Sequence, residues 1–356
     1  MQRVLITIIS LLGAILGVKL FEYLGIKDKP WEDLQRKYKV ANVQWIVLFF
    51  LFIAIICIFF PQYWADIRFV WFVIPAFLLI ITALVDEYRP LPSWFRFVIQ
   101  VVVASLIFWQ WWVGFKELVL VGKVRHFPML LSYLLTIWWF LLFVNALNWF
   151  DGINAQASLL AGLGFISIFI LTKFVVIPAY AGMIKPSEMY TLNMIINIAW
   201  VLGILSVIYS ILEFKPYALL RDVGVMFLGL ALAWLTLLGG GKMGTILIVL
   251  SLVIFDAIWV ILMRIFVYKK NPLKGDYYSH LHFRLKNIWW SKWEIRAFVL
   301  GWSLFFMILV LLQWTNKVAK IVIFLTMAIL FFWLNYYLFV VKRIDKKGKM
   351  YGKEKN

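Results

Sequence analysis

The stretch PMLLSYLLTIWWFLLFVNALNWFDGIN, residues 128–154, changes abruptly from an uncharged apolar run to a series of polar side chains. An uncharged run of this length predicts a membrane-spanning helix. Asn145, Asn148 and Asp151 follow three residues apart, so a continuing helix would place them on roughly one face. Gly152 then lets the backbone turn or lets a ligand approach closely. The stretch is either a capped helix end or a polar site at the membrane surface, and we favour the site because other loops repeat the pattern.

The composition excludes an ordinary soluble domain. The chain has 356 residues, of which 65% are hydrophobic, and its mean hydropathy is +0.93. A net charge of +18 would suit nucleic acid, but in a membrane protein it indicates cytoplasmic positive charge beside anionic lipid. We therefore expect contact with anionic membrane lipid and no nucleic-acid partner. The one cysteine, Cys57, lies in an apolar run, which indicates neither an intramolecular disulfide nor a cysteine metal cluster.

The apolar runs predict an all-α integral membrane protein, a polytopic bundle of about 11 transmembrane helices. Periodicity does not separate helix from strand in such runs, but a lipid-embedded backbone must satisfy its own hydrogen bonds, which favours helices. The first run, Val4 to Leu24, carries no usual cleavage site, so we interpret it as a retained span. The expected spans are residues 2–24, 43–60, 68–85, 94–115, 128–148, 156–178, 193–212, 223–240, 244–267, 294–314 and 319–341.

The distribution of lysine and arginine orients the chain, because short cytoplasmic loops carry an excess of both. This rule places the N-terminus outside and the C-terminus in the cytoplasm. It divides the chain into a transmembrane domain, residues 1–341, and a basic cytoplasmic tail, residues 342–356. Loop 116–127 would be external, and its alternating pattern predicts a small hairpin. The loops assigned to the cytoplasm are 25–42, 86–97, 145–154, 213–222 and 264–296.

Acidic side chains recur at these cytoplasmic loops. Asp86 and Glu87 end a span where acids have no topological use; they are either solvated or suited to a divalent cation or a proton transfer. Asp222 precedes an apolar run, where it would either cap the helix or lie beside a bound phosphate. Asp256 lies within an apolar run, either as a functional carboxylate or in a salt bridge to another span.

Basic side chains accompany the acids. His280 and His282 could bind a transition metal, but no third soft ligand is near, so with Arg284 they favour a clamp on phosphate. The basic loop 25–42 is either topological charge or a phosphate contact. Acids for a divalent ion and bases for phosphate describe a phosphoryl-transfer site, and the hydrophobic body implies a lipid substrate. The residues alone therefore indicate an integral membrane enzyme that handles phosphorylated substrates at the cytoplasmic surface.

These motifs resemble those of the polyprenyl-phosphate N-acetylhexosamine-1-phosphate transferase family (glycosyltransferase family 4), over roughly residues 25 to 290. The most specific element is Asn145-x-x-Asn148-x-x-Asp151-Gly152, which matches the family's Asn-x-x-Asn-x-x-Asp-Gly. The number of spans and the external N-terminus resemble the undecaprenyl-phosphate GlcNAc-1-phosphate transferase branch. The other matching elements are Asp28-Lys29-Pro30, Asp86-Glu87, Asp222-x-Gly224 with Phe227-Leu228-Gly229, Asp256, Arg264, Asn271-Pro272, and Ser279-His280-Leu281-His282-x-Arg284-Leu285.

The chain departs from the family pattern at several positions. Arg221 stands where the family has Gly before its metal-binding Asp, and Asn154-Ala155-Gln156 replaces the usual Asp-Gly-Leu. The remaining departures are Glu87 as the second acid, Val225 in place of Ser, Phe283 in place of the last His of the block, and Asp276 one residue farther from His280 than usual.

The resemblance implies a reaction and a set of roles. The chain would transfer a sugar-1-phosphate, expected to be GlcNAc-1-phosphate, from a UDP-N-acetylhexosamine to undecaprenyl phosphate, release UMP and start an envelope polysaccharide. It would work at the cytoplasmic face of the bacterial inner membrane. Asp222 would ligate Mg²⁺, with Mn²⁺ as an alternative, and Asp86, Glu87 and Asp151 would be catalytic. The substrate-binding residues would be Asn145, Asn148, Arg221, Asp256, Arg264, His280, His282 and Arg284.

Two other hypotheses stay open. A divergent, weakly active relative could act as a scaffold for other envelope enzymes. A transporter or lipid flippase should have inverted repeats and broken spans, and the sequence indicates neither. The sequence also allows a homodimer.

Overall fold

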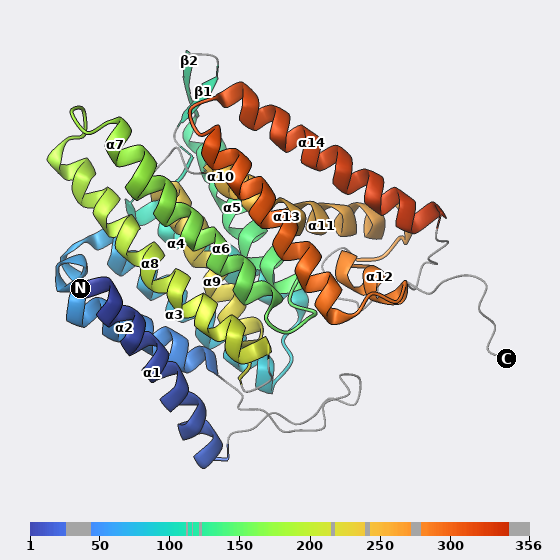
Figure 1. The fold of residues 1–356 in the computed structure, drawn as a ribbon, viewed down its shortest axis with the longest axis horizontal. Coiled ribbons are helices and arrows are strands. Elements are labelled where there is room, and N and C mark those ends of the chain that lie inside the picture. The colour runs from blue at the N-terminus through green and yellow to red at the C-terminus, as the bar shows by residue number, and fades with distance from the viewer. Residues whose placement is uncertain are drawn as a thin grey trace.

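Helices make up almost all of the part of the chain that the computed structural model describes, which is residues 1–25, 44–111, 113–115, 117–120, 123–214, 218–238, 243–271 and 279–341. The expected all-α class is confirmed, and Figure 1 shows the helices gathered into one bundle. The main helices are α1 (Gln2–Tyr23), α2 (Gln44–Phe59), α3 (Ile67–Tyr88), α4 (Ser93–Trp111), α5 (Met129–Trp149), α6 (Gln156–Ile170), α8 (Pro186–Phe214), α9 (Arg221–Leu238), α10 (Met243–Val249), α11 (Ser251–Leu262), α13 (Lys292–Leu312) and α14 (Lys317–Tyr336). Shorter helical segments are η2 (Pro61–Ala65), η3 (Leu171–Val176), α7 (Ile177–Ala179), η4 (Met263–Val267), α12 (Leu281–Asn287) and η5 (Tyr337–Val341).

Each of the eleven expected spans contains a helix, but these helices differ in length. Among the described residues, eight helices are long and apolar enough to cross a membrane, which fits a multi-pass membrane protein. Two more, α2 and α4, are apolar but shorter. The count of eleven crossings and their orientation stay predictions.

The expected span 244–267 is broken. Helices α10 and α11 meet at an angle of 76° around Leu250, whose φ of −99° and ψ of 15° lie outside the helical region. The sequence-based expectation that no span is broken is therefore wrong here. The bend had no signal in the sequence, because both halves are equally apolar and neither glycine nor proline marks the junction.

Helix α9 forms the core of the bundle. It is buried along nearly its whole length and packs against α2, α3, α5, α6 and α8. Its closest approach to α5 is at Gly229, where an added Cβ would lie 2.7 Å from the Phe143 carbonyl oxygen and 3.0 Å from Val144 Cα. Small residues let membrane helices approach this closely. The start of α9 is thereby held beside the end of α5.

The predicted hairpin is confirmed. Strands β1 (Glu117–Leu120) and β2 (Lys123–His126) pair antiparallel, with Glu117 opposite His126 and Leu120 opposite Lys123.

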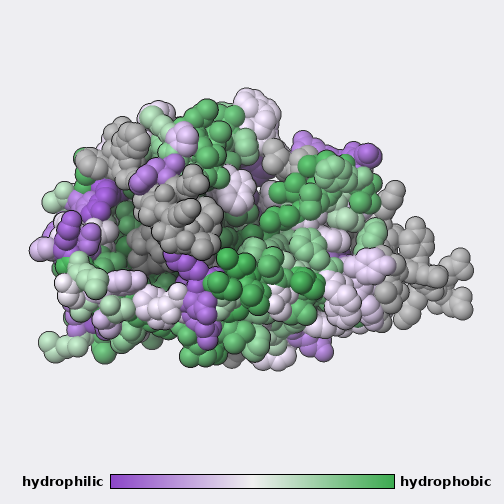
Figure 2. Space-filling model, turned by 90° about the horizontal axis from the view of Figure 1, so that it is seen from above, coloured by the Kyte–Doolittle hydropathy of each residue, from purple (hydrophilic) through white to green (hydrophobic). Residues whose placement is uncertain are grey.

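The outside of the bundle is apolar. Helix α14, drawn in red in Figure 1, lies along the surface and is the least buried of the eight candidate spans. Figure 2 shows broad hydrophobic areas on the face seen there, with hydrophilic residues gathered in smaller patches. A surface of this kind suits lipid rather than water as its surroundings.

Candidate functional site

The first polar cluster forms where the ends of α3, α5 and α8 meet the start of α9. We call Asp86, Asn148, Asp151, Glu213 and Asp222 the acidic cluster. The Asn148 side chain donates a hydrogen bond to the Asp222 carboxylate, and Asp86 is near enough to act on that carboxylate electrostatically. Four acids and one amide from separate segments thus gather at one end of the bundle, as the loop assignments predicted for three of the acids.

Three cations accompany these acids: Arg96, Arg221, and Arg296, which acts electrostatically on Glu213. Arg96 of α4 donates to Asp86 with an Nη1–Oδ2 distance of 2.9 Å, and the Leu91 amide donates to the other oxygen of Asp86 at 2.7 Å. Arg96 and Arg221 both act electrostatically on Asp222. These three arginines offset part of the negative charge of the four acids, and a divalent cation or a phosphate with its counterion could complete the charge balance.

Asp151 lies just beyond helix α5, so the helix does not continue through all three polar residues. Helix α5 ends at Trp149, and Asp151 follows in a turn, where its carboxylate accepts the N–H of Ala157 at the start of α6. Burial raises the pKa of Asp151 well above its usual range, and the nearby charges of Glu213 and Asp222 raise it further. The Asp151 carboxyl therefore takes up a proton more readily than an ordinary aspartate.

Glu213 is the residue that the sequence analysis missed. It is buried at the end of α8, where the Ser158 hydroxyl donates to it at 2.6 Å and the Leu220 amide at 2.8 Å. The signal that could have found it is the one used for Asp86, an acid ending a span on the side where acids have no topological use. Through Leu220, Glu213 also fixes the backbone just before Arg221.

Two of the departures from the family pattern have an unusual backbone conformation. Arg221 has a φ of 60° and Ala155 a φ of 70°, both in the left-handed region that favours glycine. Both positions carry Gly in the family pattern. The left-handed backbone explains why glycine suits them. In this chain the same turns are made with residues that bear side chains, at a conformational cost.

A second cluster lies beside the first and is built around Asp256 of α11. We call Asp256, Arg264, His280, His282 and Arg284 the histidine cluster. Asp256 accepts from His280 Nδ1 at 2.7 Å and from the Leu281 amide at 2.8 Å, and it lies 3.7 Å from Arg284 Nη2. The carboxylate thus pairs with the loop before α12 and with α12 itself, rather than with another span.

His282 is one of two members of this cluster with unsatisfied polar atoms among the described residues. It is buried, and neither ring nitrogen has a hydrogen-bond partner among the described residues. Its ring stacks 5.8 Å from that of His280, centroid to centroid. Burial, with a smaller contribution from His280, lowers the pKa of His282 to about 3. A neutral imidazole would contact a ligand by hydrogen bonding rather than by charge.

Arg284 and Arg264 complete the cluster. Arg284 is buried, donates to the side-chain oxygen of Asn335 and leaves its Nε and Nη1 without partners among the described residues. Arg264 is also buried, and its guanidinium lies 5.9 Å from the centroid of the Trp149 ring. A buried guanidinium with unused donors, such as that of Arg284, is suited to a phosphate or another anion.

The stretch 145–154 joins the two clusters. Asn148 and Asp151 belong to the acidic cluster, whereas the backbone at Gly152 touches the histidine cluster. An added Cβ on Gly152 would lie 2.0 Å from His282 Nε2, so only glycine allows this approach. The structure therefore brings together the two groups of motifs that the sequence analysis assigned to one membrane face.

Asn145 has a different surrounding. Its amide exchanges hydrogen bonds with Gln100 of α4, at 2.7 Å and 3.3 Å, and also donates to the Leu141 carbonyl. These contacts join α4 to α5. Its role in substrate binding stays a prediction. The side chain of Glu87, the motif at 28–30, Asp276 and the tail 342–356 lie outside the described residues.

The acidic cluster fits a magnesium ion of the kind that substrate phosphates help to hold. No group of three acids or histidines in the described residues has the geometry of a complete metal site. Mg²⁺ is, however, usually bound by one or two carboxylates with waters and substrate phosphates. Asn148 Oδ1, beside Asp222, is buried and has no hydrogen-bond partner among the described residues, so it offers a second oxygen. The magnesium assignment stays a prediction.

Comparison with known proteins agrees with the motifs. The family described as Glycosyl transferase family 4 matches residues 69–240, a segment that includes Asp86, the stretch 145–154 and Asp222. The chain is also 29% identical over 227 residues to a Bacillus subtilis (strain 168) protein named "Probable undecaprenyl-phosphate N-acetylglucosaminyl 1-phosphate transferase". The alignment covers 59% of this chain and 56% of that relative, little more than half of either. Together, the two findings support membership of glycosyl transferase family 4.

Proposed function

We propose that this protein transfers N-acetylhexosamine-1-phosphate, most simply GlcNAc-1-phosphate, from a UDP-sugar to undecaprenyl phosphate at the cytoplasmic face of the bacterial inner membrane. An oxygen of the lipid phosphate would attack the phosphorus that carries the sugar. The bond from that phosphorus to the oxygen bridging it to UMP would break, and UMP would leave. The product would be a diphosphate-linked lipid that starts an envelope polysaccharide.

One observation carries this proposal. The stretch 145–154 joins an acidic cluster, suited to a divalent cation, to a buried cluster whose Arg284 and His282 have unused polar atoms. Phosphoryl transfer needs both kinds of group, because catalysis rests on positioning the phosphates and neutralising their charge. The name of the Bacillus subtilis relative supports undecaprenyl phosphate as the acceptor and N-acetylglucosamine-1-phosphate as the transferred group.

The residues divide the task between them. Asp222, with Asn148 beside it, would hold Mg²⁺, which supplies charge neutralisation at the donor diphosphate. Asp86 would orient the lipid phosphate, whose second pKa of about 6 leaves it mostly ionised near neutral pH, so little base strength is needed. Arg284 would contact phosphate oxygens through its unused donors, and neutral His282 would accept or donate one hydrogen bond to the sugar or the diphosphate.

The direct experiment incubates membranes that contain the protein with a panel of radiolabelled UDP-sugars and identifies the lipid product. We expect label from one UDP-N-acetylhexosamine to enter a lipid that acid hydrolysis returns as the sugar. Label in no lipid, with any sugar, would contradict the proposal and favour the scaffold hypothesis.

The bend between α10 and α11 favours testing a second candidate, a lipid flippase, because broken helices are typical of transporters. Vesicles with a fluorescent polyprenyl-phosphate analogue separate the two candidates. A flippase would move the analogue across the bilayer without a UDP-sugar, whereas a transferase would change it only when the donor is added.

A further inference from the structure

A small hollow lies between α1, η3 and α8, at the opposite ends of the helices that carry the two clusters. It has a volume of ≈ 450 Å³, and it is lined by Arg3, Val4, Thr7, Ile8, Phe169, Lys173, Phe174 and Trp200. Residues 156 to 173 of the α6–η3 helix span about 25 Å at 1.5 Å per residue, which places Lys173 near the far side of the hydrocarbon layer from the acidic cluster. The hollow is thus separate from the proposed site.

Two cations from different helices meet over one aromatic ring in this hollow. The Arg3 guanidinium lies 4.9 Å from the centroid of the Phe169 ring, and Lys173 Nζ lies 5.6 Å from the same centroid. Arg3 also lies 5.9 Å from the Trp200 ring, and Lys173 lies 4.9 Å from the Phe174 ring. Neither cation has a carboxylate partner among the described residues. Two like charges that contact one ring and have no carboxylate partner favour an anion nearby.

Two other features of the hollow also favour an anion site. The indole Nε1 of Trp200 is buried and has no hydrogen-bond acceptor among the described residues. Lys173 belongs to η3, a π-helical segment inside an otherwise α-helical span, and such segments often occur at functional sites. Apart from the Thr7 hydroxyl, the described side chains that line the hollow therefore offer hydrogen-bond donors and positive charge but no acceptor.

Apart from Thr7, the rest of the lining is apolar and faces outward. Phe174 is 59% exposed, and Val4 and Ile8 of α1 are 64% and 48% exposed. In a bilayer these side chains would contact acyl chains. A cationic end beside an apolar lipid-facing groove is complementary to a phospholipid with a negative headgroup.

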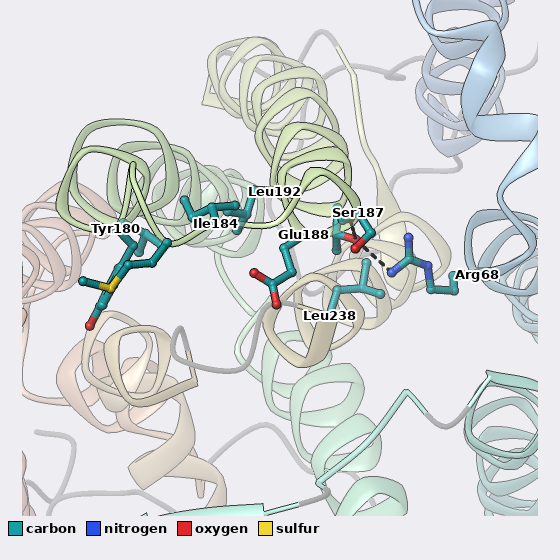
Figure 3. A pocket seen from close by; sticks show the side chains of 10 residues that line it. Arg68, Tyr180, Ile184, Ser187, Glu188, Leu192 and Leu238 are labelled. Atoms are coloured by element: carbon teal, nitrogen blue, oxygen red, sulfur yellow. Dashed lines mark hydrogen bonds between the residues drawn. The ribbon is translucent and has the colours of Figure 1, made fainter.

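A larger hollow on the same side differs in the charge balance of its lining. Figure 3 shows it between Tyr180, Glu188 and Arg68, and its volume is ≈ 600 Å³. There Arg68 is already paired with Asp66, at 2.6 Å, and donates to Thr191. Glu188 adds a negative charge to the lining. Among the described residues that line this hollow, there is no unpaired positive charge to attract an anion.

We propose that the hollow between α1, η3 and α8 binds the headgroup of an anionic phospholipid, with Arg3 and Lys173 contacting its phosphate. The acyl chains would then lie along the exposed side chains of α1 and η3. The proposal does not depend on the transferase reaction, because it concerns a separate site on the opposite side of the hydrocarbon layer. It predicts that lipid composition affects how α1 is held against α6 and α8.

The test measures lipid retention by the purified full chain, with phosphatidylglycerol and phosphatidylcholine as probes, by native mass spectrometry. We expect the wild type to retain phosphatidylglycerol in preference to phosphatidylcholine. Each cation near an anionic headgroup is worth about fivefold in affinity, so Arg3→Gln/Lys173→Gln should bind phosphatidylglycerol about thirtyfold more weakly. Lys317→Gln/Lys320→Gln is the matched control, because it removes the same charge at the start of α14, away from the hollow.

The charge-retaining variant Arg3→Lys/Lys173→Arg should bind like the wild type. Equal retention by the Arg3→Gln/Lys173→Gln variant and its control would overturn the proposal. So would failure of the charge-retaining variant, which would indicate a packing role, and so would full competition by inorganic phosphate at equal concentration. If the glutamine variant does not fold, photo-crosslinking of wild-type protein with a photoreactive phosphatidylglycerol decides the question. Crosslinks should fall on α1 and η3, and crosslinks confined to other segments would contradict the site.

Discussion

Replacing Arg221 by glycine tests two effects separately. One is the conformational cost of its left-handed backbone, and the other is the contribution of its charge to catalysis. A left-handed conformation costs a residue with a side chain about 1–2 kcal/mol. Glycine's greater freedom in the unfolded chain offsets about 0.5–1 kcal/mol of that. Because Arg221 has a φ of 60°, Arg221→Gly should raise the free energy of unfolding by about 0.5–1 kcal/mol.

Although the substitution should stabilise the fold, the loss of the Arg221 charge should impair catalysis. Arg221 lies beside Asp222, where a second cation makes physical sense if it contacts the donor diphosphate. Loss of that contact should lower kcat/KM for the UDP-sugar by roughly one to two orders of magnitude, about 1.4–3 kcal/mol. It should also steepen the dependence on Mg²⁺. The alternative is that the Arg221 side chain extends to the lipid headgroups and plays no part in the reaction.

Ala155→Gly is the control for this experiment. Ala155 has a φ of 70°, so the substitution relieves a similar strain without removing a charge. Thermal unfolding and steady-state kinetics should show both variants stabilised, but only Arg221→Gly impaired. A fully active or faster Arg221→Gly enzyme would refute the diphosphate role. An equal loss in both variants would show that backbone strain, not charge, supports activity.

Three further predictions follow from the close contacts and the buried acid. Gly152→Ala should lower kcat/KM at least tenfold, because the new Cβ would displace His282; an unchanged value in the kinetic assay would contradict the contact. Gly229→Ala should lower the free energy of unfolding by about 1–3 kcal/mol, because the backbone of α5 must move away, and a thermal melt in detergent measures this. For Asp151, the raised pKa means that the folded state binds a proton more tightly than the unfolded state, so stability should fall as pH rises from about 3.8 through the raised pKa. Asp151→Asn should flatten this part of the stability profile, and a profile unchanged by the substitution would contradict the shift.

The sequence allowed much of the fold to be predicted, because hydropathy and span length identify membrane helices directly. The hairpin was also predictable from its alternating pattern. The bend at Leu250 was not, since no local signal marks it and its two halves pack against different helices, α10 against α13 and α6 and α11 against α5. Helix α5 ends at Trp149, within one residue of the expected span 128–148, so the three polar residues do not share one continuous helix.

The candidate site was predictable in outline, because membrane topology brings alternate loops to one side. Contacts between particular side chains were not. The pairing of Asn145 with Gln100 depends on how α4 and α5 lie together, which spacing along one helix does not show. Glu213 could not be identified from spacing alone, because it is the first residue of the expected loop 213–222. Its burial and its contact with Ser158 make it part of the site.

The measurement that tests the central proposal most directly is UMP release by the purified protein, with undecaprenyl phosphate, a UDP-N-acetylhexosamine and Mg²⁺. We predict UMP and a diphosphate-linked lipid in equal amounts, release that stops when Mg²⁺ is chelated, and loss of activity in a folded Asp222→Asn variant. Removing a carboxylate from a phosphoryl-transfer metal should raise the barrier by several kcal/mol, a rate loss of about a thousandfold or more. No UMP release by the wild type, or near-normal release by Asp222→Asn, would contradict the proposal.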